Sequence, residues 1–348
     1  MRRSSAVFLI IVALILVVGA AGCGGTANAN LAAGDQSPQA ILTAALAASE
    51  DMTETAGSFD FSLTFDVDTS QMPAEALAFL DEPMVMSGTF AYADDPRAGE
   101  FTVALSMAGE TMDVGMKLVE NKFWLSLLHQ WYEAPSEMEE LMGRSFEQET
   151  QLAEIKTLLD ELGIDPVTWF KDLRLVGEEK IDGAAVYHLA GSPDIAKVMA
   201  DLMGLMQSKE FTSLVDPTGT MSGPMGMEGF LPSADDLQEM QTQLAEVFKD
   251  FTIDLWVTTD DSMLRKAAMT LSLVPPAGEE TGGFNSMALN ASISLQDVDG
   301  AVTVEPPASA LPFSALEKAM EENPEMFFGP LMGLMGGLGG YGMGTGTY

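Results

Sequence analysis

The sequence predicts an α+β protein whose main element is a curved antiparallel sheet, forming a half-open β-barrel with helices that cover its concave apolar face. Apolar and polar residues alternate along several segments, which is typical of strands that bury one face. Short turn sequences separate these segments, as in an antiparallel meander. Helical segments are few for this strand area, and a long one-faced sheet must curl or be covered.

The N-terminal residues indicate export. Arg2 and Arg3 precede an uncharged apolar run over residues 7–18, and small residues then lead to Cys23, the only cysteine of the chain. This order is typical of a secretory signal, here residues 1–22. A single cysteine cannot close an intramolecular disulfide, so we favour lipid attachment as the role of Cys23.

The segment Ala20–Cys23 resembles a bacterial lipobox, in which the cysteine is lipidated and becomes the new N-terminus. The resemblance implies anchoring on the extracytoplasmic face of the cell membrane. Residues 23–36 are rich in Gly, Ala and Asn and are expected to form a flexible tether. The alternative is a transmembrane anchor, for which the apolar run is short.

Composition limits the range of partners. With 348 residues and 47% hydrophobic content, the chain can bury a substantial core. Its formal net charge of -36 repels phosphate backbones, so no nucleic-acid partner is expected. The same charge predicts that the folded body stands off the membrane while the N-terminal lipid anchor holds it there. Solubility or adaptation to salt also accounts for the acidity.

The first half of the chain begins with a helix and continues as strands. Ser37 and Pro38 provide a helix cap and a favoured first position for a helix over residues 39–52. Period-two alternation then predicts strands over residues 58–68, 101–107, 112–118 and 123–127. A helical region over 136–162 ends this half.

The second half mixes helices and strands. Asp165-Pro166 and Ser192-Pro193 predict helices over 167–171 and 194–208, and Asp182-Gly183 predicts a hairpin turn between strands. The remaining predicted elements are strands over 173–179, 184–190, 251–257, 264–273 and 287–295, a helix over 233–249 and a loop over 211–232. One domain thus covers residues 37–312, and a low-complexity Gly/Met-rich tail covers 313–348.

The inventory of catalytic groups is poor, so no enzymatic activity and no cofactor are expected. His188 falls in an alternating strand, and His129 lies beside Trp131 at a strand end; both fit structural roles better than general-base catalysis. Two separated histidines make a zinc site improbable. Asp297–Gly300 lacks the further ligands of a calcium loop, so no metal site is predicted.

Methionine is unusually abundant, with 25 residues. Its flexible, polarisable side chain suits either an ordinary core or the lining of a lipid cavity, and the sequence leaves both open. Under the second interpretation, the predicted cavity lining comes from apolar strand residues and one covering helix. These residues are Phe59, Phe61, Phe65, Met107, Met116, Met199, Met203, Met206, Trp256, Met287 and Leu289.

Three segments, Asp172–Gly191, Leu255–Leu271 and Val302–Pro312, resemble the LppX/LprG group of bacterial lipoproteins and the wider family related to the carrier LolA. The resemblance implies a lipidated, exported, non-enzymatic protein with a half-open barrel and a hydrophobic cavity. It implies an acyl lipid or a lipidated molecule as the ligand, bound or transferred in the cell envelope. One alternative is a signalling or assembly lipoprotein of the same fold, with a filled core and an envelope protein partner. A second is an unrecognised hydrolase.

Replacing Cys23 tests the anchor. Cys23→Ala removes the thiol to which lipid is attached, so the protein is expected to leave the membrane fraction while its fold is unchanged. Membrane fractionation and circular dichroism measure the two effects. Membrane retention of a chain that carries no lipid would favour the transmembrane alternative.

Overall fold

The computed structural model describes residues 36–49, 54–68, 70, 82–94, 97–107, 109–120, 122–135, 157–208, 211, 247–275, 284–296 and 302–322. The predicted signal sequence, Cys23 and almost all of the tether lie outside these residues. So do most of the predicted helices over 136–162 and 233–249, most of the loop over 211–232, and the tail beyond residue 322.

The described strands form one twelve-stranded sheet in the order β12-β6-β5-β4-β3-β2-β1-β11-β10-β9-β8-β7. All neighbours pair antiparallel except β12 and β6, which are parallel. The strands are β1 (Glu54–Val67), β2 (Met84–Asp94), β3 (Arg97–Met107), β4 (Glu110–Val119), β5 (Lys122–Leu127), β6 (Gln130–Glu133), β7 (Arg174–Ile181), β8 (Ala184–Gly191), β9 (Phe248–Thr258), β10 (Leu264–Leu273), β11 (Phe284–Gln296) and β12 (Leu311–Pro312).

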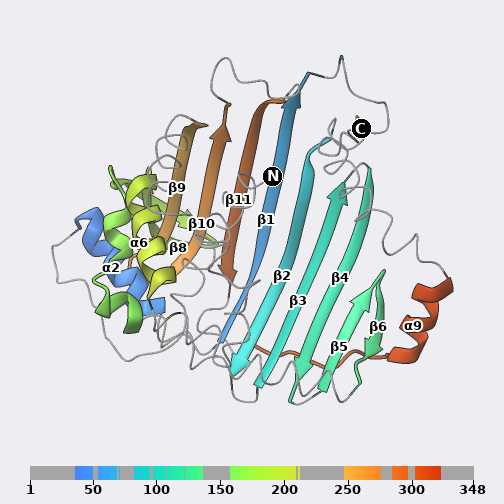
Figure 1. The fold of residues 1–348 in the computed structure, drawn as a ribbon. Helices are drawn as coiled ribbons and strands as arrows, with labels where there is room; N and C mark the ends of the chain where they lie inside the picture. The colour runs from blue at the N-terminus through green and yellow to red at the C-terminus, as the bar shows by residue number, and fades with distance from the viewer. Residues whose placement is uncertain are drawn as a thin grey trace.

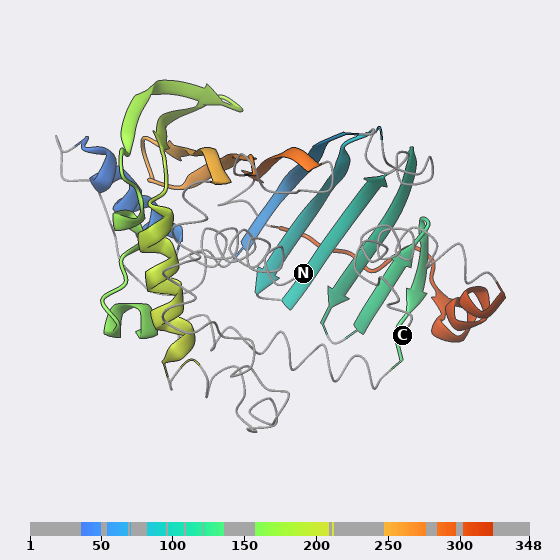
Figure 2. The same ribbon diagram turned by 45° about the horizontal axis from the view of Figure 1, so that its top comes forward.

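Two meanders meet at β1, near the middle of the sheet (Figure 1). One runs from β1 through β2 to β6, and the other runs from β7 to β11, which returns to pair with β1. The sheet is strongly twisted and does not close, because its two edge strands, β12 and β7, lie at opposite ends (Figure 2). The prediction of a curved, open antiparallel sheet is therefore confirmed.

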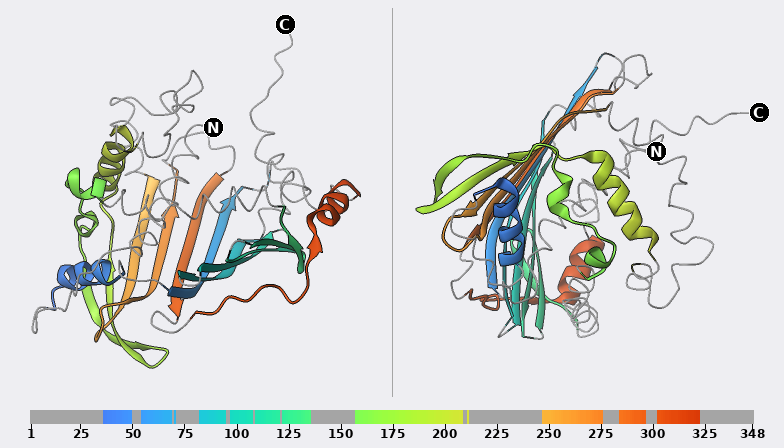
Figure 3. Two further views of the ribbon diagram at one scale, coloured as in Figure 1. Left: turned by 90° about the horizontal axis from the view of Figure 1, so that it is seen from below. Right: turned by 90° about the vertical axis from the view of Figure 1, so that its left-hand side faces the viewer.

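Few helices accompany the sheet in the described part of the chain. The longer ones are α2 (Pro38–Ser49), α6 (Ile195–Gln207) and α9 (Phe313–Glu322), and η2 (Pro166–Trp169) is a short 3-10 helix. Helices α2 and α6 lie at the β8–β10 end of the sheet, whereas α9 lies at the β6 end (Figure 3). Cover of the whole concave face by helices stays a prediction.

The predicted caps are present at the starts of α2 and η2, but Asp194, and not the predicted Ser192, caps α6. The Ser37 hydroxyl accepts from the Ala40 N–H at 3.3 Å, and the Asp194 carboxylate accepts from the Lys197 N–H at 3.2 Å. Asp165 likewise accepts from the Val167 N–H, at 2.9 Å, where η2 begins. These bonds satisfy amide groups that have no partner within the helix.

Several parts of the fold differ from the sequence prediction, among them β6 and β12, which were not predicted as strands. Strand β2 was not predicted, because Gly88 and several small residues weaken its apolar alternation. The predicted tail begins with α9, in which only Leu316 is buried. Strand β9 begins at Phe248, so the predicted helix over 233–249 extends two residues too far.

Gly88 in β2 is required because the ring of Phe59 in β1 lies over it. Phe59 pairs with Gly88, and a Cβ there would come within 2.5 Å of the Phe59 ring and 2.0 Å of the Thr102 carbonyl oxygen. The Phe59 ring stacks on Phe101 of β3, with ring centroids 5.4 Å apart. The glycine in β2 thus lets the aromatic rings of β1 and β3 pack together across it.

Gly88→Ala is expected to lower the free energy of unfolding by about 1–3 kcal/mol, because the new methyl group overlaps backbone as well as a side chain. The midpoint of urea unfolding measures the change. Gly177→Ala is the matched control, since a Cβ at Gly177 in β7 meets no atom within 4 Å. Equal midpoints for the two variants would contradict this account of Gly88.

Candidate functional site

Strand pairing places most of the predicted cavity residues on one apolar face of the sheet. Phe61 pairs with Ala291, Leu63 with Leu289, and Phe65 with Met287, so β1 and β11 point these side chains to the same side. The cross-strand register carries this face through β2 to β3 and β4. The predicted residues that share it are Phe59, Phe61, Phe65, Met107, Met116, Met287 and Leu289.

One end of this apolar face is packed as a core. Leu189, Leu271 and Leu289 are at most 3% exposed in a cluster that includes residues of β8–β11, α2, η2 and α6. Met199 of α6 belongs to the cluster, and Met203 is also buried. The backbone of Met206 continues α6, but its side chain lies outside the described residues. Met199 and Met203 therefore contribute to a filled core at this end.

The other end of the apolar face is more open. Its buried cluster contains Leu118, Phe123 and Ala134, with Met116 and Leu125 packed against it. Most apolar-face side chains of β2–β4 are half-buried, and Phe101 is 38% exposed. The apolar face is thus continuous, but its described part is unequally buried.

Trp256 does not lie with the other predicted residues. It pairs with Lys266 and His188 on the polar face of the sheet. Trp256 therefore lies on the polar face and not in the predicted cavity lining. Along β9 the apolar positions are Phe251, Ile253, Leu255 and Val257, and Trp256 has the opposite parity. The alternation along the sequence could therefore have assigned Trp256 to the polar face.

On the polar face, His188 joins three strands. Its Nδ1 lies 2.8 Å from Glu179 Oε1 in β7 and its Nε2 lies 2.8 Å from Asp254 Oδ1 in β9. The imidazole stacks on the Trp256 indole at 4.5 Å, and the indole N–H donates to Glu179 Oε2 at 3.1 Å. The expected structural role of His188 as a hydrogen-bonded strand residue agrees with this arrangement.

His129 occupies the turn between β5 and β6 and has a φ of 65°. Its Nε2 lies 3.2 Å from Asp113 Oδ2, and its side chain is 82% exposed. An exposed ion pair of this kind contributes little to stability. The structural role expected for His129 stays a prediction.

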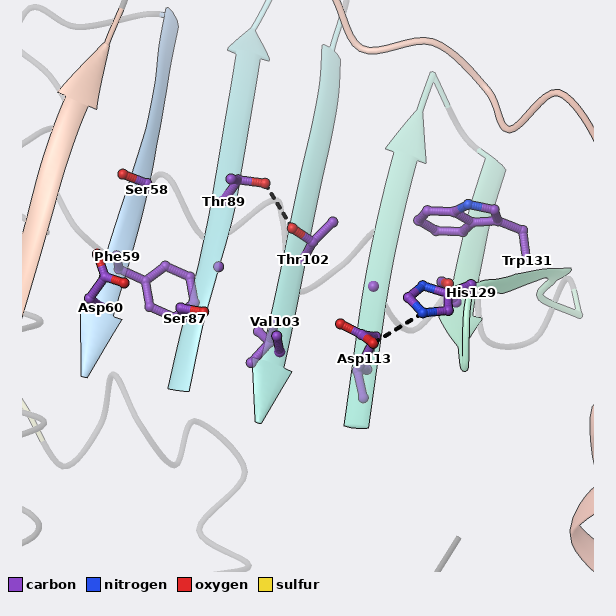
Figure 4. Close-up of a pocket in the computed structure, with 15 residues that line it drawn as sticks. Ser58, Phe59, Asp60, Ser87, Thr89, Thr102, Val103, Asp113, His129 and Trp131 are labelled. Atoms are coloured by element: carbon purple, nitrogen blue, oxygen red, sulfur yellow. Dashed lines mark hydrogen bonds and ion pairs between the residues drawn. The ribbon is translucent and has the colours of Figure 1, made fainter. Parts of the chain in front are cut away.

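A groove with a volume of about 450 Å³ lies on the polar side of β1–β6, and His129 borders it (Figure 4). Polar residues of the five strands β1–β5 and of the turn after β5 line most of it. They are Ser58, Asp60, Ser87, Thr89, Thr102, Asp113, Ser126 and His129, with Trp131 at one end. The sequence prediction did not find this groove, because its residues are far apart in the chain and only the strand order brings them together.

Among the described residues, no three His, Cys, Asp or Glu side chains are grouped closely enough to hold a metal ion. None of the helices in the described part of the chain is long and apolar enough to cross a membrane.

No family model and no curated protein matches the sequence. Among solved structures, the chain is similar to lipoprotein LppX from Mycobacterium tuberculosis, with 14% identity and a TM-score of 0.33 over 77% of this chain and 98% of that chain. It is also similar to LprF from Mycobacterium bovis, with 14% identity and a TM-score of 0.31 over 78% and 97% of the two chains. A LolA superfamily protein from Nitrosomonas europaea has 8% identity and a TM-score of 0.17 over 75% and 92%. Each of these similarities concerns the fold alone.

The His188 cluster predicts a pH dependence of stability. Hydrogen bonding by His188, and then by Trp256, holds the pKa of Glu179 below its usual value of 4.5. A depressed pKa in the folded state stabilises the fold above that value, and this contribution is lost as the pH falls through the lowered pKa. Glu179→Gln is therefore expected to flatten the dependence of the unfolding midpoint on pH between about pH 5 and pH 3.

Glu178→Gln is the matched control for this measurement, because Glu178 is the exposed neighbour of Glu179 in β7 and has no hydrogen bond to His188. Its unfolding midpoint should follow that of the unchanged protein across the same pH interval. The same flattening in both variants would mean that general charge, not the His188 bond, causes the effect.

Proposed function

We propose that this chain is a membrane-anchored extracytoplasmic lipoprotein that binds lipids or lipidated molecules in the cell envelope and transfers them. Its ligand lies against the apolar face of the sheet, at the half-buried β1–β4 end. No covalent bond is made or broken. The observation that carries the proposal is the continuous apolar face across β1–β4, with large side chains that are only partly buried.

The aromatic and methionine side chains of this region suit an acyl ligand. Phe59 and Phe101 form a stacked pair, and Met107 and Met116 lie on the same face. Unbranched thioether side chains adapt to flexible apolar partners, and the rings supply large contact areas. Because such contacts are not directional, this region can accept acyl chains of different length.

The free energy available is sufficient for useful affinity. Burial of one methylene group contributes about 0.8 kcal/mol, so about ten methylene groups contribute about 8 kcal/mol. This amount corresponds to micromolar dissociation before the cost of association is subtracted. A fatty acyl chain can therefore be held without recognition of its headgroup.

The alternative is a signalling or assembly lipoprotein with a filled core and a protein partner. The packing of Met199 and Leu289 within the main cluster favours it, because these predicted cavity residues are 5% and 3% exposed. The two functions differ in whether the β1–β4 end of the apolar face binds lipid.

Native mass spectrometry separates the two functions. The measured protein begins after the signal sequence and carries Cys23→Ser, so that any associated lipid is a ligand and not the anchor. Added mass that organic solvent extracts as lipid is expected. Absence of extractable lipid, together with no binding of fluorescent fatty acids, would leave the filled-core function.

A substitution on the apolar face tests where the lipid binds. Phe101→Asn places an amide among apolar contacts and is expected to weaken fluorescent fatty-acid binding about tenfold, because an unpaired buried amide costs about 1–3 kcal/mol. Thr64→Asn introduces the same amide on the exposed polar side of β1 and should leave binding unchanged. Unchanged binding in both variants would show that lipid binds away from Phe101.

A further inference from the structure

The polar groove has a floor of small side chains. Ser87 in β2 and Ala104 in β3 pair with each other, and Gly115 in β4 and Ser126 in β5 pair next to them. Because these residues are short, a hollow of about 450 Å³ remains above the sheet. This volume lies within the range of about 300–1,000 Å³ that is usual for small-molecule sites.

Trp131 reaches into the groove from β6 (Figure 4). A Cβ at Gly115 would lie 3.1 Å from Trp131 Cη2 and 3.1 Å from the Ser126 Cβ, so the indole extends across β5 to the edge of β4. The glycine thus gives the indole the room to lie close to the sheet. The ring is half-buried and borders the groove with an apolar surface.

The position for a cation beside this indole is already filled. The Lys117 ammonium lies 5.4 Å from the centre of the Trp131 ring. Glu100 holds it at 3.2 Å, and it donates to the Glu305 carbonyl oxygen, also at 3.2 Å. A ligand cation would have to compete with this lysine, so a neutral ligand is favoured.

Polar groups along the groove are available to a ligand. Within the described part of the chain, the side chains of Ser58, Asp60 and Ser87 form no hydrogen bond or ion pair. Further along, the hydroxyls of Thr89 and Thr102 lie 2.7 Å apart and can each make another bond. Hydroxyl and carboxylate groups in such a row match a ligand that itself carries many hydroxyl groups.

The length of the groove indicates the size of this ligand. Strands lie about 4.8 Å apart, so the distance from β4, where the Trp131 indole ends, to Asp60 in β1 is about 14 Å. A single sugar ring cannot contact both residues. A chain of a few sugar units that lies across the strands can do so.

We propose that the polar groove binds a short neutral oligosaccharide. One sugar ring places its apolar C–H face on Trp131, and hydroxyl groups of the other units donate to Asp60 and bond to the serine and threonine hydroxyls. Two carboxylates in the groove and a net charge of -36 disfavour an anionic ligand. This site is on the opposite face of the sheet from the proposed lipid site, so each can fail without the other.

Isothermal titration of the full-length protein tests the proposal, in a detergent without a sugar headgroup. The probes are cellotriose, maltotriose, mannotriose and chitotriose, with putrescine and tetramethylammonium as cationic competitors. At least one oligosaccharide is expected to bind, with an affinity that added salt does not change. Binding of the cations alone, or of none of the sugars, would overturn the proposal.

Substitutions locate the binding. Asp60→Ala is expected to weaken oligosaccharide binding about tenfold, since it removes a charged acceptor. Asp250→Ala removes an equally exposed carboxylate from the polar side of β9, outside the groove, and should change affinity less than twofold. Trp131→Ala should abolish binding, while fluorescent fatty-acid binding is unchanged. Equal affinities for Asp60→Ala and Asp250→Ala would place the sugar elsewhere and overturn the proposal.

Discussion

The pairing of β1 with both β2 and β11 is the constraint on which the rest of the structure depends. It joins two meanders that would otherwise be separate sheets, and it fixes which side of each strand is apolar. A slip of one residue would exchange the faces, so that Phe61 would replace a polar residue such as Asp60 on the wetted side. The close fit of Phe59 over Gly88 is specific to the observed register.

This register gives the molecule two chemically different faces, and the helices add a second asymmetry. Since α2, η2 and α6 share the main core cluster with β8–β11, that end of the apolar face is a packed interior. Among the described residues, the β2–β4 end has only a small buried cluster beside it, which includes residues of β4 and β5. Stability and the proposed ligand binding can therefore rest on different parts of one sheet.

Much of this arrangement could be predicted from the sequence, because alternation, caps and turns are local signals. The Asp182-Gly183 turn is an example: both residues have positive φ, as the predicted hairpin requires. Strand β2 escaped prediction because Gly88 interrupts its apolar positions, and only contact with Phe59 explains the glycine. The polar groove could not be predicted either, since it depends on strand order across β1–β6 and not on any one segment.

Trp256 and Trp131, both on the polar face, show why residue type alone does not identify a site. Trp256 has its ring stacked on His188, its N–H bonded to Glu179, and Lys266 lying 5.0 Å from its ring centre. Its neighbours are long or charged, and they occupy the space around it. Trp131 has Gly115 and Ser126 next to it, and these short residues leave a groove that its indole borders. The size of the neighbouring side chains, set by strand pairing, therefore makes one tryptophan structural and leaves the other available to a ligand.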